Sequence, residues 1–275
     1  MIRPVRLLLG AAPLLAGLRL LAACAVVPET VAPSLPRPLA GPEVFLDRLE
    51  ADEGAVKTVR GLASVRYEGP AGKGSATQVI VVALPDRARL EALSPLGTAV
   101  LLLAIRGDGL TMYAPTRHEY GVGRATRETL GRLARVPVPP GPLLRLLVGL
   151  PPLPIRPGDP RVQLAVEAAA IRVESVDGPF WQRVWSSPDG MAPERGELGE
   201  AGGLLLTFEF GEWRRLNGVL FPFAVHLDEA TAGTRLAIQY ETVRLNEPVE
   251  AGLFELPQPA DGATRIIDLG AGPLP

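Results

Sequence analysis

Short apolar segments alternate with turn-forming residues along most of the chain, and this pattern restricts the fold more than any other feature. Each segment is rich in β-branched and other apolar residues and stops at Gly, Pro, Asp or Ser, as at 94–97 and 107–109. Spacing this regular predicts an antiparallel meander. The expected strands are 56–67, 74–84, 88–93, 99–105 and 110–114, and later 161–167, 170–176, 180–186, 203–210, 219–228 and 234–245.

Three segments have helical rather than strand periodicity. Residues 43–53 place apolar side chains at helical spacing before the first strand, and 126–136 and 142–150 separate the two groups of strands. Thr126 is a suitable N-cap for the second helix, and Pro142 suits the first turn of the third. The predicted order of helix, sheet, helix pair and sheet indicates an α+β fold.

The segment 142–150 is unusually apolar for a helix that lies on a sheet. Arg145 is the main side chain of this segment that suits water, so apolar side chains occupy both sides of the helix and both sides must be shielded from water. Ordinary packing between helix and sheet accounts for any single leucine. A lid over a cavity is the alternative, because a long curled sheet in a chain with 5% aromatic residues has difficulty filling its concave side. The leucines concerned are Leu143, Leu144, Leu146, Leu147 and Leu150.

The first residues have the three-part pattern of a secretory signal. A basic start is followed by an apolar run that is too short to span a bilayer, and the run ends at Leu21-Ala22-Ala23-Cys24. This ending resembles the bacterial lipobox, which implies a signal peptide over 1–23 and a Cys24 that carries acyl chains at the mature N-terminus. The alternative is cleavage elsewhere, with Cys24 an ordinary small residue. Two or three acyl chains would form a stable membrane anchor.

A proline-rich stretch follows the signal. Residues 24–42 have few charges and no helical or strand period, so we expect a linker in an extended polyproline II conformation. The remaining residues, 43–275, are expected to form one domain. Within it, 187–202 is rich in Gly, Pro and Glu and predicts a loop, and 254–269 forms a tail after the last predicted strand.

Charge and residue counts argue against several classes of function. The formal net charge is −2, which is unfavourable for nucleic-acid binding. A single Cys excludes an intrachain disulfide, and two histidines, His118 and His226, leave little material for a metal centre. None of the common nucleophile, phosphate-loop, dinucleotide or zinc-protease motifs occurs. We therefore expect a protein that binds rather than catalyses, without metal or cofactor.

The segments 94–103 (SPLGTAVLLL), 130–151 (LGRLARVPVPPGPLLRLLVGLP) and 204–243, in this order, resemble the LolB-like outer-membrane lipoprotein receptors. The LolA-type periplasmic carriers and RseB/MucB-type sensors share their architecture. The resemblance implies a half-open (incomplete) antiparallel β-barrel with helices covering the concave side, whose apolar interior receives acyl chains. The acidic insertion at 187–202 and the tail at 254–269 depart from the family pattern.

The hairpin tip Pro95-Leu96-Gly97 is a candidate membrane-insertion loop. Leucine is unusual at a turn, and the matching leucine of LolB-like proteins protrudes and helps to release lipoproteins into the membrane. The alternative is that Leu96 folds back onto the sheet edge. An exposed apolar tip on a tethered domain would bring a cavity mouth to the bilayer.

The candidate acyl-chain cavity is predicted from the most lipophilic elements that can face one another. We select Leu101 and Leu103 from the strand at 99–105, and Leu143 and Leu147 from the apolar helix.

The resemblance implies a monomeric, lipid-anchored protein on the periplasmic face of the outer membrane. Its partners would be lipoprotein cargo and a LolA-like periplasmic carrier, and its task would be to insert the cargo into the membrane. The alternative function is an envelope sensor or assembly partner that uses the same fold to bind proteins.

Overall fold

The computed structural model describes residues 41–270, except 71, 135, 168–169 and 232, and all the described residues belong to one unit, Pro36–Pro275. The predicted signal peptide, Cys24 and nearly all of the linker therefore lie outside the described residues. Three α-helices occur in the described part: α1 (Pro42–Ala55), α2 (Arg127–Ala134) and α3 (Pro140–Leu147). Two 3₁₀ turns, η1 (Pro115–Arg117) and η2 (Ala251–Phe254), complete the helical elements there.

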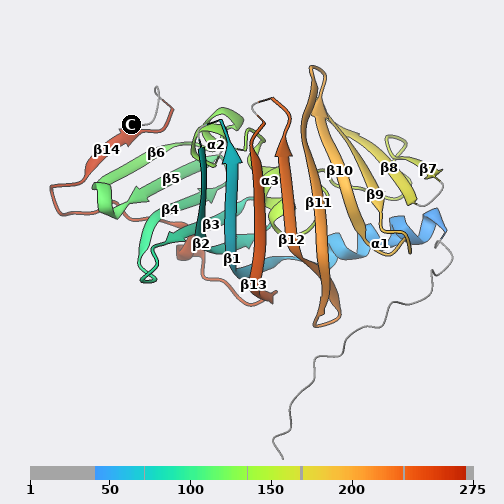
Figure 1. Cartoon of the computed structure of the whole chain (residues 1–275), viewed down its shortest axis with the longest axis horizontal. Coiled ribbons are helices and arrows are strands. Elements are labelled where there is room, and N and C mark those ends of the chain that lie inside the picture. The colour runs from blue at the N-terminus through green and yellow to red at the C-terminus, as the bar shows by residue number, and fades with distance from the viewer. Residues whose placement is uncertain (1–40, 71, 135, 168–169, 232, 271–275) are drawn as a thin grey trace, which may run out of the picture. The chain divides into compact units, whose positions relative to one another are not determined.

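The strands form a single sheet (Figure 1). Before α2 the chain forms β1 (Thr58–Gly69), β2 (Gly72–Ala83), β3 (Arg87–Leu93), β4 (Ala99–Arg106), β5 (Gly109–Ala114) and β6 (Glu119–Arg124). After α3 it forms β7 (Gln163–Glu167), β8 (Ala170–Asp177), β9 (Phe180–Ser186), β10 (Pro193–Glu200), β11 (Gly203–Leu216), β12 (Val219–Glu229), β13 (Arg235–Leu245) and β14 (Arg265–Asp268).

The strand order is β14-β6-β5-β4-β3-β2-β1-β13-β12-β11-β10-β9-β8-β7. All neighbours are antiparallel except β14, which runs parallel to β6. The sheet is open, with β14 and β7 as its two ends. The predicted α+β class and the open antiparallel sheet are thus confirmed. The two predicted groups of strands are joined by the pairing of β1 with β13, in which Val65 lies opposite Ile238.

The prediction of a loop over 187–202 is wrong, because Pro193–Glu200 forms β10 between β9 and β11. Glycine and glutamate have low strand propensity, but both types of residue are accommodated at their positions in β10. Gly196 lies under the ring of Phe208, where a methyl group would be 2.3 Å from Cζ. Leu198 is fully buried on the same face. Packing against a neighbouring ring therefore overrides local propensity.

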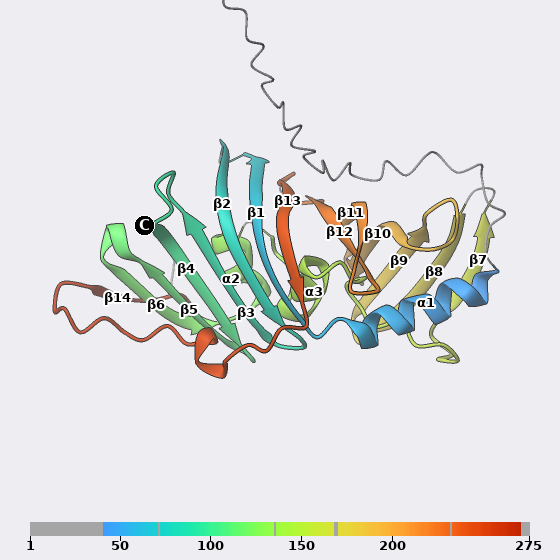
Figure 2. The same cartoon turned by 90° about the horizontal axis from the view of Figure 1, so that it is seen from below.

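Two further strands were not predicted. Residues 119–124 form β6, whose Gly121 and Gly123 leave room for the fully buried Leu269. The tail forms β14, and before it η2 packs on the outer face of β2 through Phe254. The hydroxyl of Tyr120 donates to the carbonyl of Leu256 at 2.6 Å. The tail thus runs along the outer side of the β2–β6 half of the sheet (Figure 2).

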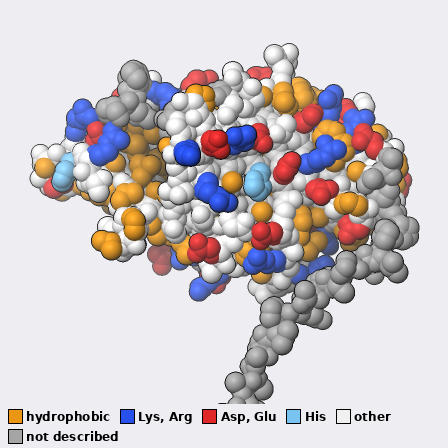
Figure 3. Space-filling view, in the orientation of Figure 1, with side chains coloured by type: hydrophobic (Ala, Val, Ile, Leu, Met, Phe, Trp, Pro, Cys, Tyr) orange, Lys and Arg blue, Asp and Glu red, His pale blue; other side chains and the backbone are white. Residues whose placement is uncertain are grey.

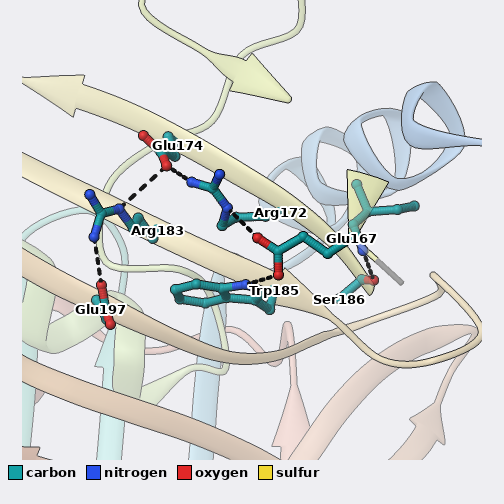
Figure 4. A network of polar contacts seen from close by, with 8 residues as sticks. Glu167, Arg172, Glu174, Arg183, Trp185, Ser186 and Glu197 are labelled. Atoms are coloured by element: carbon teal, nitrogen blue, oxygen red, sulfur yellow. Dashed lines mark hydrogen bonds and ion pairs between the residues drawn. The ribbon is translucent and has the colours of Figure 1, made fainter. Parts of the chain in front are cut away.

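The outer face of β7–β10 carries a chain of alternating charges (Figure 4). Arg172 contacts Glu167 at 2.7 Å and also pairs with Glu174. Arg183 continues the chain to Glu174 and Glu197, at 3.3 and 3.4 Å. Cross-strand pairs of opposite charge stabilise neighbouring strands modestly and keep this face in water.

Candidate functional site

An apolar cavity of about 530 Å³ lies against the inner face of β13 and β1–β4. Apart from Ser75, the strand residues that line it are spaced by two positions, as the pleat requires. The floor is formed by short side chains, Gly74 and Ala76 of β2 and Ala92 of β3. Longer apolar residues from the same strands and from β1, β4 and β13 form the walls: Val65, Ile80, Leu90, Leu101, Leu103, Leu236 and Ile238.

Helices α2 and α3 cover this cavity. Leu133 and Val136 contribute from α2 and the residues after it, and Leu143 and Leu147 from α3. Helix α3 is fixed at its C-terminal end, because the hydroxyl of the buried Tyr240 donates to the carbonyl of Leu147 at 2.7 Å. Burial raises the pKa of this phenol, so Tyr240 stays a donor at physiological pH.

Arg145 connects α3 to the rest of the interior. Its guanidinium pairs with Glu53 of α1 at 3.1 Å, and its Nε donates to the carbonyl of Pro151 at 2.7 Å. Burial lowers the pKa of Arg145, and the nearby Glu53 carboxylate partly offsets this effect. Arginine remains charged under such conditions, so the contact is an ion pair that anchors the cover of the cavity to α1.

Tyr67 lies at one end of the cavity and is 37% exposed. Its ring packs on Gly74, where a methyl group would be 2.6 Å from Cε1. The two residues are directly paired across β1 and β2. An aromatic ring over a strand glycine covers backbone that would otherwise face water, and this pairing holds the ring at the cavity end.

The hairpin between β3 and β4 extends from the cavity wall. Leu96 at its tip is 93% exposed. Gly97 has φ +79°, which suits the turn, and the Ser94 hydroxyl accepts from the backbone N–H of Leu96 and Thr98. The turn is thus defined by local hydrogen bonds that do not involve the Leu96 side chain. Figure 3 shows hydrophobic side chains gathered over the β4–β6 end of the sheet.

The structure brings together the four leucines selected from the sequence: Leu101, Leu103, Leu143 and Leu147 all line the cavity. Pro95, Leu96 and Gly97 lie at the hairpin tip, outside its lining. His226 is exposed on β12 and His118 is exposed after η1. No charged side chain occurs among the described residues that line the cavity. The cavity therefore suits hydrocarbon and disfavours a charged ligand.

The sequence argument missed the small residues of the floor and the tyrosine at the end. A usable signal was present, because Gly74 and Ala76 occupy alternate positions of one strand. Small residues repeated with a period of two on the face that points inward leave space between a sheet and its cover.

No protein-family model and no curated protein sequence matches this chain. Several solved structures are similar in fold. A DUF1329 family protein from Desulfovibrio piger aligns with a TM-score of 0.56 at 10% identity, covering 81% of this chain and 98% of that one. A putative outer membrane lipoprotein-sorting protein domain from Vibrio parahaemolyticus aligns with a TM-score of 0.55 at 13% identity, covering 78% and 95%.

A LolA superfamily protein from Nitrosomonas europaea gives a TM-score of 0.51 at 13% identity, covering 78% of this chain and 97% of that one. Identities this low establish the fold alone. The open antiparallel sheet with covering helices is therefore a LolA-like fold. Among the described helices, none combines the length and the apolar character that crossing a bilayer requires.

Proposed function

We propose that this protein binds acyl chains of lipoproteins in the cavity and passes them to the outer membrane, without catalysis. One observation carries the proposal. The uncharged cavity and the exposed Leu96 are parts of one structure, since β3 and β4 form the cavity wall and meet at the Leu96 turn. A hairpin tip inserted into a leaflet would therefore place the cavity beside the membrane.

Transfer needs no external energy source if affinities increase along the route. The cavity must bind an acyl chain more tightly than a periplasmic carrier does, and the bilayer must bind it more tightly still. Each buried CH₂ contributes about 0.8 kcal/mol, so small differences in chain burial are sufficient. A LolA-like carrier is the proposed donor, and the receiver acts as a monomer.

The proposed location is the periplasmic face of the outer membrane, with Cys24 as the lipid anchor. Replacing Cys24 with Ala should give a product that is uncleaved or leaves the membrane fraction. Unchanged fractionation and unchanged mass of the mature protein would contradict the anchor. The alternative function, a sensor or assembly module, predicts a filled interior, and the cavity supports transfer instead.

The function is tested by separating acyl-chain binding from delivery. Leu96→Glu adds a charge at the tip but touches neither core nor cavity, so the free energy of unfolding should change by less than about 0.5 kcal/mol. Uptake of a fluorescent fatty acid should be unchanged, whereas transfer of a lipidated cargo into liposomes should be slow.

Val122→Glu is the matched control, because Val122 is an exposed apolar residue on β6, away from the hairpin. Normal delivery by a stable Leu96→Glu variant would remove the insertion role. Failure of the parent protein to take up the fatty acid would overturn the proposed function itself.

A further inference from the structure

Gln78 of β2 brings a side-chain amide into the wall of the apolar cavity. Its directly paired neighbours across the sheet are Ala63 of β1 and Ala92 of β3, so small apolar side chains flank it on both sides. Among the described residues of the lining, the only other polar side chains are those of Tyr67 and Ser75, and both of these residues are exposed. Gln78 is therefore a polar group set within a hydrocarbon wall.

Exposure falls along the strands from the Tyr67 end of the cavity to the opposite end. On β2, Gln78 is partly exposed, whereas the next inward residue, Ile80, is only 1% exposed. On β4 the same step leads from the partly exposed Leu101 to the buried Leu103. The cavity thus opens beside Tyr67 and closes beyond Gln78, so the amide lies well inside it.

A second inward-facing glutamine, Gln182 of β9, shows how the fold accommodates an amide with a structural role. Gln182 is fully buried, accepts from the backbone N–H of Leu153, and donates to the carbonyl of Leu153 and to the hydroxyl of Ser175. In contrast, no hydrogen bond joins the amide of Gln78 to any other residue that the structure describes. Inward-facing polar groups are usually paired within the protein, so the Gln78 amide is available to a molecule in the cavity.

An acyl chain without polar substituents would cover Gln78 with carbon. The amide would then lose water without gaining a partner, which opposes binding. A hydroxyl group both donates and accepts, as the amide does, so a hydroxyl at this depth would satisfy it. We infer that Gln78 is a specificity-determining residue that selects a hydrocarbon chain with a hydroxyl group part of the way along it. This inference rests on the proposed function and narrows its ligand from acyl chains in general to hydroxylated chains.

The length of β2 sets the place of that hydroxyl on the chain. Gln78 follows Gly74, which lies opposite Tyr67 at the open end, by about 13 Å along the strand. An extended hydrocarbon advances about 1.3 Å per carbon, since its bonds of about 1.5 Å follow a zigzag. A chain whose polar end stays in water beside Tyr67 would thus present roughly its tenth carbon to Gln78. The carbons beyond it would contact the buried apolar end of the cavity.

The selection is tested by displacing a fluorescent fatty acid from the full-length mature protein. The competitors are octadecanoic acid, 10-hydroxyoctadecanoic acid and 2-hydroxyoctadecanoic acid. The 10-hydroxy acid should bind roughly tenfold more tightly than octadecanoic acid, because only it provides a partner for the desolvated amide. A hydroxyl group by itself weakens the hydrophobic driving force, so hydrophobicity predicts the opposite order. The 2-hydroxy acid keeps its hydroxyl at the open end and should bind no more tightly than octadecanoic acid.

Gln78→Leu nearly keeps the size of the side chain and removes the amide. This variant should lose the preference for the 10-hydroxy acid and should bind octadecanoic acid at least as tightly as the parent does. Thr77→Val is the matched control, because Thr77 is the preceding residue of β2, is exposed and lies outside the cavity lining. It should retain the preference.

Nuclear magnetic resonance provides a second measurement that does not depend on affinity. The side-chain NH₂ signals of Gln78 are identified by their absence from the Gln78→Leu spectrum. They should shift more when the 10-hydroxy acid binds than when the 2-hydroxy acid binds, because only the first places an oxygen beside the amide.

Uptake of the fluorescent fatty acid by the parent protein tests the proposed function separately. If the parent does not take it up, the proposed function fails and the role of Gln78 fails with it. If the three acids compete equally, if the 2-hydroxy acid matches the 10-hydroxy acid, or if Gln78→Leu retains the preference, hydrocarbon binding stands and only the role of Gln78 is overturned. If Gln78→Leu does not fold, the order of the three acids on the parent still decides.

Discussion

The inner face of the sheet is filled in one half and hollow in the other. Over β11, β12 and β13, aromatic rings pack against one another, with centroids 5.1 Å apart for Phe208 and Phe210 and 5.4 Å apart for Phe221 and Tyr240. Over β2 and β3, Gly74, Ala76 and Ala92 stand at comparable inward positions and leave the cavity. The location of the hollow is thus set by side-chain size on one continuous sheet.

The covers of the two halves differ as well. The filled half is closed by a chain segment that is tied down with polar contacts. The buried Gln182 of β9 accepts from the backbone N–H of Leu153 and donates to its carbonyl, each at 2.9 Å, and also donates to Ser175 at 2.8 Å. The hollow half is closed by two short helices. Of these two helices, α3 is held by the Tyr240 hydroxyl and by Arg145.

The largest expected effect is the loss of an aromatic ring from the filled half. Phe208→Ala should lower the free energy of unfolding by about 3–5 kcal/mol, because it leaves a cavity in close-packed surroundings. Leu101→Ala should cost less than about 2 kcal/mol, since Leu101 is half-buried and already borders a hollow. Urea unfolding of both variants measures the difference, and equal costs would contradict the division into filled and hollow halves.

A pair of glycines sharpens the comparison. Gly196→Ala would place a methyl group 2.3 Å from the Phe208 ring and 2.5 Å from the backbone oxygen of Arg183, so it should cost about 1–3 kcal/mol. Gly74→Ala meets only the ring of Tyr67, a partly exposed side chain that can shift at low cost, and should cost less than about 1 kcal/mol. Thermal unfolding provides the measurement, and a larger loss for Gly74→Ala would reverse the assignment.

The contact between the halves should have an intermediate effect. Arg145→Leu removes the ion pair with Glu53 and the hydrogen bond to Pro151, and should cost about 1–2 kcal/mol, below the usual value for a buried pair because Glu53 is partly exposed. Amide hydrogen exchange should become faster in α3 than in β11. Glu53→Gln, which keeps a hydrogen-bonding group, is the milder control. Unchanged exchange in α3 would mean that Tyr240 alone fixes the helix.

The sequence indicated most of this architecture, and its omissions share a physical cause. Strands with β-branched residues, such as β2, and the leucines of α3 were predictable because their period is local. Strands β6 and β10 were not, because Gly121 and Gly123 are favourable only beneath Leu269 of the tail, and Gly196 only beneath Phe208 of the next strand. The cavity leucines could be identified because they are lipophilic. The cavity floor could not, because it consists of residues with very small side chains or none.

The smallest expected effect concerns Asp52, a mostly buried carboxylate in α1, the helix to which Arg145 anchors the cover. Burial raises its pKa above the ordinary 3.8, and the contact of Arg48 Nε with Oδ2, at 2.9 Å, offsets this only in part. The folded protein thus holds this proton more strongly than the unfolded chain does. Stability linked to Asp52 is complete below pH 3.8 and is lost as pH rises through the folded pKa.

Asp52→Asn removes that loss and should leave the protein as stable as the parent at pH 7 or more stable, by less than about 1 kcal/mol because water still reaches part of the group. The advantage should shrink as pH falls toward 4. Asp47→Asn, on the exposed side of α1, should change stability by less than about 0.5 kcal/mol at every pH. Chemical unfolding from pH 4 to 8 tests both. If Asp52→Asn were destabilising at pH 7, the Arg48 contact would outweigh burial, and the filled half would depend on an ion pair at its edge as well as on packing.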